Sequence, residues 1–587
     1  MILVFGGTTE GRSAISVLEE AGTPFFYSTK TGEQEVKLHH GTAVAGGMNS
    51  HEISSFCKAH AIRLLVDAAH PFAKELHRNV AEAASEMAIP VIRFERIYPP
   101  RDPSLTWIDD YSQLPPLHGT LLATTGVQSI SRLKPFESES LRIIYRILRR
   151  DSSLRLAERQ GADSHQLCYY DEQEDFSETL SRLRPDAVLM KESGLTGGFA
   201  EKCSAAKSTG TRVIVLRRPE MPERFIVVNG PYGLRRMVER LLPEFYPLHS
   251  GLTTGTYATA AAVAQATRLL CGEQPELVPV ILPDGETIHV DVCYGDGYAY
   301  VVKESGDDPD VTNGIEIRAE VEPSDRFEVC GGAGIGRITL PGFDYPPGEP
   351  AINRGPRQML ETNLRPFGQP LRVTLSVPQG EEIAQKTFNP RLGIEGGISI
   401  IGVTGIIKPY SEEAFIQSIR KCMEIARSSG AERVVINSGG KSESYVRKYY
   451  PDLPSQAFVE YGNYIGETLQ IADDLHIGRI TMGVMLGKAV KLAAGHLDTH
   501  SRRTTMDLPF VLSMLREAGC DESTLLKASS ITLARELWDI LPQDRRQPFS
   551  EVVIRHCMAH CAPLLPEGEL TILLIDDNGH IYNQGEL

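Results

Sequence analysis

A glycine-rich turn near the start of the chain has the residue types of a phosphate-binding site. Residues 2–5 are apolar and strand-like, and a helical pattern begins a few residues later. Glycines let the backbone approach a ligand closely, and free N–H groups at a helix start attract anions. An ordinary tight turn between a strand and a helix is the alternative. The residues predicted to bind a dinucleotide here are Gly6, Gly7, Thr8, Thr9, Glu10 and Arg12.

The next expected strand, at residues 25–28, ends in Ser28, Thr29 and Lys30. Parallel strands place their carboxyl ends at one edge of a sheet, so these residues should lie beside the glycine turn. A site that prefers NAD usually carries an acid at this position, whereas hydroxyls and a cation suit a 2′-phosphate. We therefore predict NADPH as the cofactor. In the alternative interpretation Lys30 is a solvated surface lysine.

Reactive side chains follow two other expected strands of the first half. His70 comes after the strand at residues 64–67, and Lys191 and Ser193 come after the strand at 187–190. Open α/β sheets bind ligands beyond the carboxyl ends of their strands, so these three residues are predicted to be catalytic. A His70 that only caps the following helix is the alternative. Arginine-rich strand ends suit an anionic second substrate, and the predicted substrate-binding residues of this half are Arg146 and Arg217.

Three strand ends with glycine or polar residues follow one another in the second half. The strands are expected at residues 433–436, 457–460 and 479–485. Such ends can line one crevice of the size of adenosine, in which an acid can hold the ribose. Ordinary turns between strands and helices are the alternative. The predicted cofactor-binding residues are Asn437, Gly439, Gly440 and Glu460.

Other stretches of the second half carry residues suited to an anionic substrate. One is a Thr/Gly turn before an alanine-rich helix expected at residues 257–270, and two others, at 348–357 and 389–397, are rich in Gly, Pro and Arg. A strand is expected directly after the last of these, at residues 398–403. The predicted substrate-binding residues are Thr253, Thr254, Arg354, Arg391, His496, His500 and Arg502.

No metal site is predicted. The histidines of residues 495–503 lack the general-base glutamate of a zinc HExxH motif. The acidic loop 304–314 lacks the glutamate at the twelfth position of a calcium loop. The His/Cys cluster 556–561 lies on one expected helix, which cannot surround a tetrahedral ion. The glycine run 331–337 leads into a strand-like segment, whereas a dinucleotide fingerprint needs a helix there.

Charge and composition narrow the classes of protein. The 587 residues include 60 Lys and Arg against 76 Asp and Glu, a net charge of −16. This balance argues against non-specific nucleic-acid binding. No apolar run approaches the roughly 18 residues of a membrane span. No signal-peptide pattern follows Met1, and the cysteines form no CxxC, so we expect a cytoplasmic protein without a membrane segment.

The element pattern predicts two halves. The first, residues 1–247, is expected to be α/β, with two Rossmann-like lobes around a cleft. A proline-rich hinge should separate lobes of about 1–114 and 120–247. The second half, residues 248–587, is expected to be α+β. A homo-oligomer is compatible with this sequence, which does not fix the oligomeric state.

The first half resembles a known family in its motifs GGTTEGR, DAAHPFA, TTG after a strand, and KESG followed by an RRP strand end. Over about residues 1–245 these are similar to the (cobalt-)precorrin-6A reductases of vitamin B12 synthesis. The resemblance implies NADPH and hydride delivery to a double bond of the macrocycle. It also implies a substrate with many carboxylates, which matches the arginine-rich strand ends.

The second half resembles another family in GLTTGT, GDDPDVTNG, GEPAINRGPR, NPRLGIEGGISIIGVTG and GHLDTHSR. Across 251–503 these are similar to the cobalt-precorrin-5B C1-methyltransferases. The resemblance implies S-adenosylmethionine (SAM) as methyl donor and a fold other than the usual methyltransferase fold. The family often has CA after TTGT, where this chain has Tyr257 and Ala258, and this difference argues against a thiol function there.

The two resemblances fit one pathway. C1 methylation of cobalt-precorrin-5B yields cobalt-precorrin-6A, which the first half would reduce. We therefore predict a bifunctional enzyme of cobalamin biosynthesis that acts on an anionic cobalt-tetrapyrrole. Two other classes stay open, a tetrapyrrole-binding carrier without turnover and an amidohydrolase that uses a threonine of the TTGT turn as nucleophile.

Overall fold

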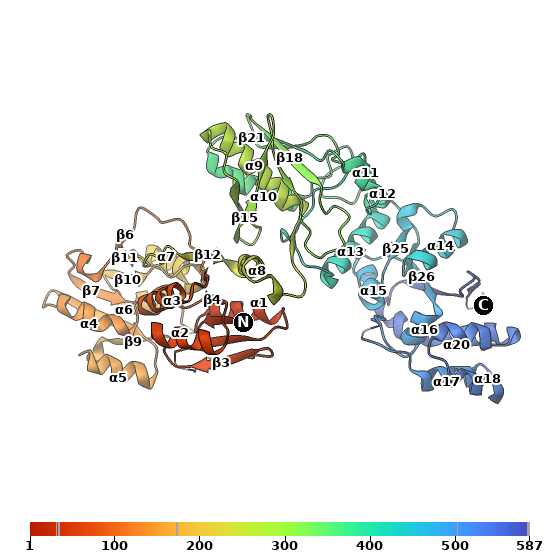
Figure 1. Cartoon of the computed structure of the whole chain (residues 1–587), viewed down its shortest axis with the longest axis horizontal. Helices are drawn as coiled ribbons and strands as arrows, with labels where there is room; N and C mark the ends of the chain where they lie inside the picture. Colours follow the sequence, from red (N-terminus) through yellow and green to blue (C-terminus); the bar gives the residue numbers. More distant parts are fainter. Residues whose placement is uncertain (31, 33–35, 172–173, 502, 584–587) are drawn as a thin grey trace. The chain divides into compact units, whose positions relative to one another are not determined.

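The computed structural model describes residues 1–30, 32, 36–171, 174–501 and 503–583 (Figure 1). The chain divides into two compact units. The first consists of residues 1–250 and 279–290, and the second consists of residues 251–278 and 291–587. The segment 279–290 thus returns to the first unit after the second has begun, which the sequence analysis did not anticipate.

The first unit begins with a six-stranded parallel sheet of order β12-β5-β4-β1-β2-β3. Alternate residues of β1 face opposite sides, with Ile2 and Val4 in one apolar cluster and Leu3 and Phe5 in another. Helices therefore cover both faces, as in a Rossmann-like fold. The elements are β1 (Ile2–Phe5), α1 (Thr9–Glu19), β2 (Phe25–Thr29), β3 (Gly41–Ala45), α2 (Ser50–Ala59), β4 (Leu64–Asp67), α3 (Lys74–Met87), β5 (Val91–Glu95), β12 (Phe225–Asn229) and α8 (Gly230–Leu241).

A second six-stranded parallel sheet, of order β6-β11-β10-β7-β8-β9, completes the α/β part of this unit. Its central strands are buried apolar runs, which parallel sheets require because helices cover both faces. The elements are β6 (Thr106–Ile108), β7 (Gly119–Ala123), α4 (Ile130–Leu133), β8 (Leu141–Ile147), α5 (Asp151–Arg159), β9 (Leu167–Tyr169), α6 (Phe176–Leu183), β10 (Ala187–Lys191), α7 (Phe199–Ser208) and β11 (Arg212–Leu216).

The two sheets do not follow the predicted lobes of about 1–114 and 120–247. Strand β6 precedes the predicted hinge but pairs with β11 of the second sheet. Strand β12 crosses back and pairs with β5, so that β12 and α8 belong to the first sheet. Strand order depends on pairing between distant segments, which local sequence patterns do not reveal.

A two-stranded hairpin, β14 (Leu277–Ile281) and β15 (Thr287–Asp291), brings residues 279–290 to helix α8. The Glu286 carboxylate accepts the backbone N–H of Tyr232 at 2.9 Å and that of Gly233 at 3.2 Å. These are among the free N–H groups of the first turn of α8, so Glu286 caps this helix. A side chain at Gly230 would collide with Glu286, which explains the glycine.

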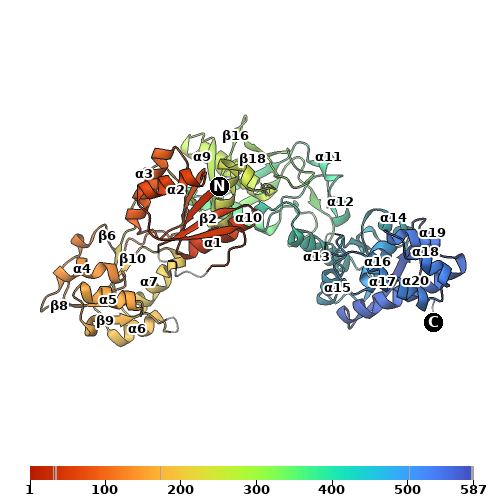
Figure 2. The same ribbon diagram turned by 60° about the horizontal axis from the view of Figure 1, so that its bottom comes forward.

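The second unit contains a five-stranded sheet of order β16-β17-β18-β21-β19. Helix α9 (Thr254–Cys271) packs on β17 and β18 and also contacts α10 (Arg354–Leu364), as Figure 2 shows. Its alanines are buried, because small side chains allow close approach on two sides. The strands are β16 (Cys293–Tyr294), β17 (Ala299–Val302), β18 (Glu316–Pro323), β19 (Glu328–Gly331) and β21 (Leu371–Ser376).

Short elements follow in the loops of this region. The expected strand at residues 398–403 is wrong, because Ile398 and Ile400 form only isolated bridges, with Ile335 and Ile352. The backbone here is consumed by loop contacts rather than by a ladder. The short elements are β13 (Gly251–Leu252), β20 (Arg337–Ile338), α11 (Gly380–Ala384), α12 (Asn389–Leu392), β22 (Ile394–Glu395) and β23 (Ile406–Ile407).

The last part of the second unit has a sheet of order β25-β24-β26-β27-β28, in which only β28 is antiparallel. Cys557 and Cys561 are buried in its apolar core. The elements are α13 (Glu412–Ser428), β24 (Val434–Asn437), α14 (Gly440–Tyr449), β25 (Phe458–Glu460), α15 (Ile465–Asp474), β26 (Arg479–Met485), α16 (Leu486–Ala493), α17 (Leu508–Glu517), α18 (Glu522–Ala528), α19 (Leu537–Ile540), α20 (Gln543–Cys561), β27 (Glu569–Ile575) and β28 (Ile581–Tyr582).

Across the described residues, no helix combines the length and apolar character needed to span a bilayer. In the same part of the chain, no group of three or more His, Cys, Asp or Glu side chains is arranged to hold a metal ion.

Candidate functional sites

The glycine turn lies at the carboxyl edge of the first sheet, as predicted. Thr8 caps α1 by accepting the N–H of Gly11 at 3.0 Å, and its hydroxyl donates to the Ala68 carbonyl at 2.7 Å. A Cβ at Gly6 would lie 2.1 Å from the Tyr27 hydroxyl, and Gly7 has a φ of +95°. Both positions therefore require glycine. The result is a close backbone turn at the start of an eleven-residue helix.

The end of β2 lies beside this turn, because the Gly6 N–H donates to the Ser28 carbonyl at 2.9 Å. Ser28 is buried, Thr29 is half-buried and Lys30 is exposed. Arg12, on the first turns of α1, donates to the Thr9 hydroxyl at 3.3 Å. The structure thus brings the predicted hydroxyls and cations to one edge of the sheet.

Glu10 differs from its predicted role as a cofactor ligand. Its carboxylate accepts the Thr196 hydroxyl at 2.6 Å and pairs with Arg96 at 3.0 Å. Burial alone would raise the pKa of Glu10, but the hydrogen bond from Thr196 and the charge of Arg96 hold it below its ordinary value. Glu10 therefore links the glycine turn to the loop after β10, using interactions within the chain.

Arg96 completes this link. It follows β5, and its Nη1 donates to the Ser193 carbonyl at 2.8 Å. The Ser193 hydroxyl donates to the Gly197 carbonyl at 3.1 Å. Ser193, predicted to be catalytic, thus lies where the carboxyl edges of the two sheets meet, with its hydroxyl engaged by its own loop.

His70 and Lys191 lie close together at the same place. The Phe72 N–H donates to His70 Nδ1 at 3.2 Å, and Lys191 Nζ lies 4.9 Å from the centre of the Phe72 ring. Burial, then the charges of Arg96 and Lys191, lower the pKa of His70 to about 4, so its imidazole is neutral at pH 7. Burial also lowers the pKa of Lys191.

His70 does not cap the following helix, because α3 has Ala73 at its N-cap and no side-chain bond there. Lys191 makes no hydrogen bond or ion pair with any described residue. An amine that is largely buried without a partner is unusual, and such groups concentrate at functional sites.

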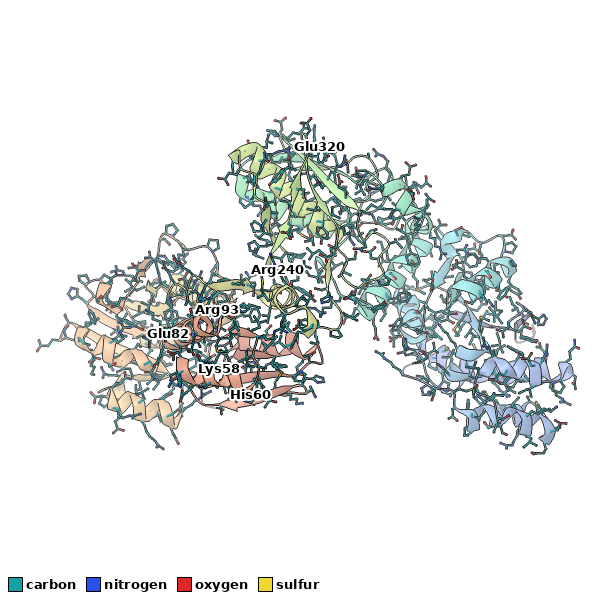
Figure 3. The ribbon with its side chains drawn as sticks, viewed as in Figure 1. Lys58, His60, Glu82, Arg93, Arg240 and Glu320 are labelled. Carbon is teal, nitrogen blue, oxygen red and sulfur yellow. The ribbon has the colours of Figure 1, made fainter. Side chains whose placement is uncertain are left out.

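A buried charge network beneath this loop was missed by the sequence analysis. Asp67 binds His77 Nδ1 at 2.5 Å, and His77 Nε2 contacts the Pro71 carbonyl at 3.2 Å. Arg93, 1% exposed and marked in Figure 3, donates to Asp67 at 3.0 Å and to the Ala69 carbonyl at 2.9 Å. The network fixes the backbone on both sides of His70. The acid that ends β4 was its only sequence signal.

The two arginines predicted to bind substrate in this unit differ. Arg217 pairs with Asp109 at 2.9 Å, so its charge is already balanced. Arg146 is 7% exposed and packs between the rings of Tyr170 and Phe176, with its Cζ 4.9 and 5.1 Å from their centres.

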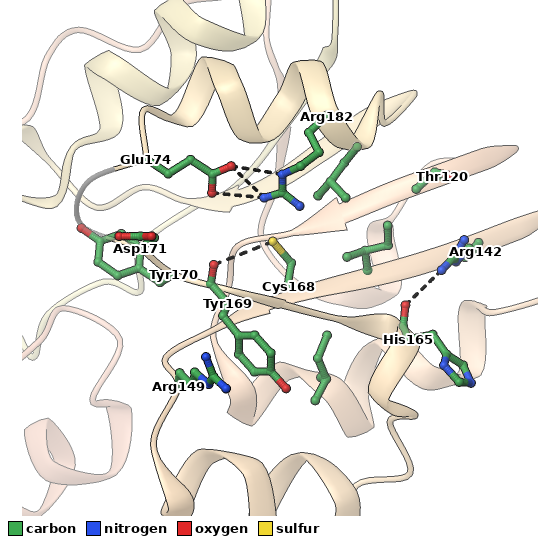
Figure 4. Close-up of a pocket in the computed structure, with 13 residues that line it drawn as sticks. Thr120, Arg142, Arg149, His165, Cys168, Tyr169, Tyr170, Asp171, Glu174 and Arg182 are labelled. Carbon is green, nitrogen blue, oxygen red and sulfur yellow. Dashed lines mark hydrogen bonds and ion pairs between the residues drawn. The ribbon is translucent and has the colours of Figure 1, made fainter.

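A separate groove of about 840 Å³ lies along the edge strands β8 and β9 of the second sheet (Figure 4). The Glu174–Arg182 ion pair, at 2.8 Å, closes one side, and Arg142 donates to the His165 carbonyl at 3.0 Å. No predicted site residue lines this groove among the residues that the structure describes.

In the second unit, the three predicted strand ends do meet, because β24 pairs with both β25 and β26. Asn437 accepts the Gly439 N–H at 2.8 Å and donates to the Val459 carbonyl at 3.3 Å. Gly439 has a φ of +84°, and a Cβ there would lie 2.2 Å from a Glu460 carboxylate oxygen. The Gly439-Gly440 turn then opens helix α14.

Glu460 makes no hydrogen bond or ion pair with any described residue. Burial, then the charge of Glu443, raises its pKa. Lys488 lies nearby and donates to the Gly462 carbonyl, and burial lowers the pKa of its amine to about 8. Arg391 joins this crevice through an ion pair with Glu443 at 3.1 Å.

Arg354 lies at the start of α10 and lines a pocket of about 730 Å³. Two other arginines line it. Arg337 donates to the Gly348 carbonyl at 2.8 Å, and Arg357 stacks on Tyr345, with its Cζ 4.2 Å from the ring centre. The pocket is therefore strongly basic on one side.

The segment 389–405 joins the crevice to this pocket. It carries Arg391 at one end, and its Ile400 carbonyl accepts the N–H of Asn353, next to Arg354, at 3.0 Å. Farther along, Ile401 is half exposed and Val403 is 87% exposed. This apolar pair lies beside the arginines of both sites.

Thr253 and Thr254 hold this segment. The Thr253 hydroxyl accepts the Thr256 N–H, and the Thr254 hydroxyl accepts the Ile401 N–H at 2.9 Å and donates to the Ile401 carbonyl at 3.2 Å. Both residues are buried. Their hydroxyls shape the loop rather than project as nucleophiles.

His496 and His500 lie in the loop after α16, not on one helix face. His500 donates its backbone N–H to Asp498 at 2.9 Å. The structure does not bring either histidine to the Glu460 crevice through a described contact. The predicted site residue Arg502 lies outside the described residues.

Comparisons with known proteins match each part of the chain to a family. Residues 1–231 match the family model "Precorrin-6x reductase CbiJ/CobK", residues 243–409 match "CbiD", and residues 498–586 match "CbiD, C-terminal domain". The chain is 42% identical over 345 residues to a cobalt-precorrin-5B C(1)-methyltransferase of Prosthecochloris aestuarii, covering 56% of this chain and 94% of the relative. It is 40% identical to that of Thermus thermophilus, covering 52% and 85%. A solved precorrin-6A reductase, CobK, aligns at 19% identity over 41% of this chain and 97% of its own, with a TM-score of 0.34.

Proposed function

Because the chain belongs to the cobalt-precorrin-5B C1-methyltransferase family and carries a precorrin-6x reductase domain over residues 1–231, we propose that it catalyses two steps of cobalamin biosynthesis. The second unit methylates C1 of cobalt-precorrin-5B with SAM, and the first unit reduces the resulting cobalt-precorrin-6A with NADPH. The domain boundary lies near residues 247–248. The observation that carries this proposal is the match of two different families to two separate compact units.

The first unit fits NADPH. Gly6 and Gly7 leave no side chain between the backbone and a pyrophosphate at the start of α1. Ser28, Thr29 and Lys30 lie beside them, where hydroxyls and a cation suit a 2′-phosphate. NADPH supplies a hydride when bound. The chain positions the macrocycle against it and excludes water at the meeting point of the two sheets.

Reduction of a double bond also requires a proton, for which Lys191 is the best-placed donor. Its ammonium group has no partner among the described residues, and burial lowers its pKa toward neutrality. His70 is neutral at pH 7 and accepts an N–H at Nδ1, so it orients the loop and leaves proton donation to Lys191. The Asp67–His77–Arg93 network holds this loop in place.

The second unit fits SAM. Glu460 is an unpartnered acid at a strand end, which suits the two ribose hydroxyls, and the glycine turn at 439–440 leaves room beside it. SAM supplies an electrophilic methyl group when bound. The chain aligns the macrocycle and excludes water rather than providing a strong base. Arg354 and Arg391 bind carboxylates of the substrate, and the apolar Ile401 and Val403 face the ring.

Equilibrium dialysis with radiolabelled cofactors tests this assignment. We expect the full chain to bind one equivalent each of NADPH and SAM, and neither cofactor should displace the other. Gly7→Ala should weaken only NADPH binding, because the added Cβ strains a positive φ. Gly439→Ala should weaken only SAM binding. Competition between the cofactors, or loss of both affinities in either variant, would refute two separate sites.

A further inference from the structure

Arg146 is a buried cation without a counter-charge. It makes no hydrogen bond or ion pair with any residue that the structure describes, and its Nε has no partner. The rings of Tyr170 and Phe176 flank the guanidinium. Ring faces attract a cation, but more weakly than the cost of removing a full charge from water. The arrangement therefore lacks an anion.

A second cation lies beside it. Lys202, in the first turn of α7, donates to the Gly197 carbonyl at 3.0 Å and makes no ion pair with any described residue. Burial and then the charges of Arg146 and other neighbours lower the pKa of its amine, which shows that the two cations repel each other. Arg96 also lies near, but Glu10 already balances its charge.

The loop between the cations leads to the reaction centre. Gly197 accepts both the Lys202 amine and the Ser193 hydroxyl, and Lys191 lies two residues before Ser193. An anion held by Arg146 and Lys202 would therefore lie beside the ring that Lys191 protonates. Arg146 can present a planar fork and Lys202 a point charge, a donor set suited to one carboxylate.

We propose that Arg146 and Lys202 form an oxyanion-binding pair that holds one peripheral carboxylate of the reductase substrate and so fixes which face of the macrocycle meets the hydride. The proposal rests on the reductase function proposed above. A phosphate of the dinucleotide has the same chemistry, and the experiment separates the two sources.

The test uses full-length Arg146→Met and Lys202→Met. Each is expected to weaken cobalt-precorrin-6A binding, followed by absorbance without NADPH, by ~10–100-fold, because a buried charge partner is lost. NADPH affinity should change less than ~3-fold. Arg149→Met and Lys207→Met remove exposed cations from the same stretch and the same helix, and they should behave like the wild type.

A second readout does not depend on the reductase reaction. Without ligand, Lys202→Met should unfold at the same temperature as the wild type or higher, because it relieves repulsion between unpaired cations. A loss confined to NADPH affinity would assign the pair to the cofactor phosphate. Unchanged affinity for both ligands would overturn the oxyanion site. If the wild type binds the precorrin without reducing it, the reductase proposal fails while the affinity test of the pair stands.

Discussion

At the scale of single residues, the first unit is defined by side chains whose charges are not balanced in the expected way. Glu10, expected to face a ligand, is paired within the chain, whereas Lys191 is buried without a described partner. This contrast shows where sequence motifs are informative. GGTTEGR and KESG identify the positions, but only the fold shows which side chains remain available for chemistry.

Replacement of Lys191 by Met should lower the reductase rate by about 10²–10⁴-fold, the usual contribution of a general acid. NADPH affinity should stay within a factor of about three, because Lys191 is expected to act on the macrocycle. Single-turnover oxidation of bound NADPH measures the rate. Lys207→Met is the control, because Lys207 is exposed and pairs with Asp102. A wild-type rate in Lys191→Met would assign the proton to another donor.

The pH dependence of His70 follows from its surroundings. With a pKa of about 4, His70 is neutral above about pH 5, so its imidazole should not titrate between pH 5 and 7. The Lys191 charge contributes to this lowering, so Lys191→Met should raise the pKa of His70 modestly, while burial still keeps it below the ordinary value. NMR titration of the His70 ring protons measures both. A pKa near 6.5 in the wild type would contradict the buried, cation-flanked position.

Glu460 is the corresponding residue of the second unit. Glu460→Gln keeps the shape of the side chain but removes the charge that we expect to accept two ribose hydroxyls. SAM affinity should fall by about 10-fold, which corresponds to about 1.4 kcal/mol. Calorimetric titration with SAM measures the change, and NADPH affinity is the internal control. An unchanged SAM affinity would place the ribose elsewhere.

At the scale of elements, periodicity and turn residues predicted most strands and their ends but not the strand order. The three ends at Asn437, Glu460 and Met485 were expected to line one crevice, and pairing of β24 with both neighbours brings them together. In the first unit, β6 and β12 exchange sheets against expectation. Strand order depends on contacts between distant segments, which a single sequence does not encode locally.

The hairpin β14–β15 makes a prediction about stability. Burial, then the charge of Asp284, raises the pKa of Glu286 to about 8, against an ordinary value of 4.5. The folded chain therefore keeps a proton that the unfolded chain releases above pH 4.5. The stabilising contribution is complete below that pH and is lost as the pH rises toward 8, by about 2–4 kcal/mol.

Glu286→Gln keeps an acceptor for the N–H groups of Tyr232 and Gly233 but does not titrate. We expect it to flatten the pH dependence of the first unit's unfolding free energy between pH 5 and 8. The chain has two tryptophans, Trp107 and Trp538. Urea unfolding followed by Trp107 fluorescence, in a Trp538→Phe background, therefore reports on the first unit. Glu286→Ala should lower stability at every pH because the helix cap is lost. Equal slopes in the wild type and Glu286→Gln would show that Glu286 does not carry the effect.

At the scale of the whole molecule, two families occur in one chain in the reverse of their reaction order. The motifs identified both families from sequence because they combine glycine turns with reactive side chains at fixed spacing. The buried network of Asp67, His77 and Arg93 was not predicted, since its members are separated in sequence and meet only in the fold. The same reason hid residues 279–290, which lie within the second family's sequence but complete the first unit.

The most direct test of the bifunctional assignment is an anaerobic incubation of the chain with cobalt-precorrin-5B, SAM and NADPH, followed by mass spectrometry. Each cofactor is omitted in turn. We predict a product with one added methyl group when SAM alone is present, and a further two hydrogens when NADPH is added. Lys191→Met should stop at the methylated product. An unchanged mass, with substrate competence verified by a separate methyltransferase, would contradict the account.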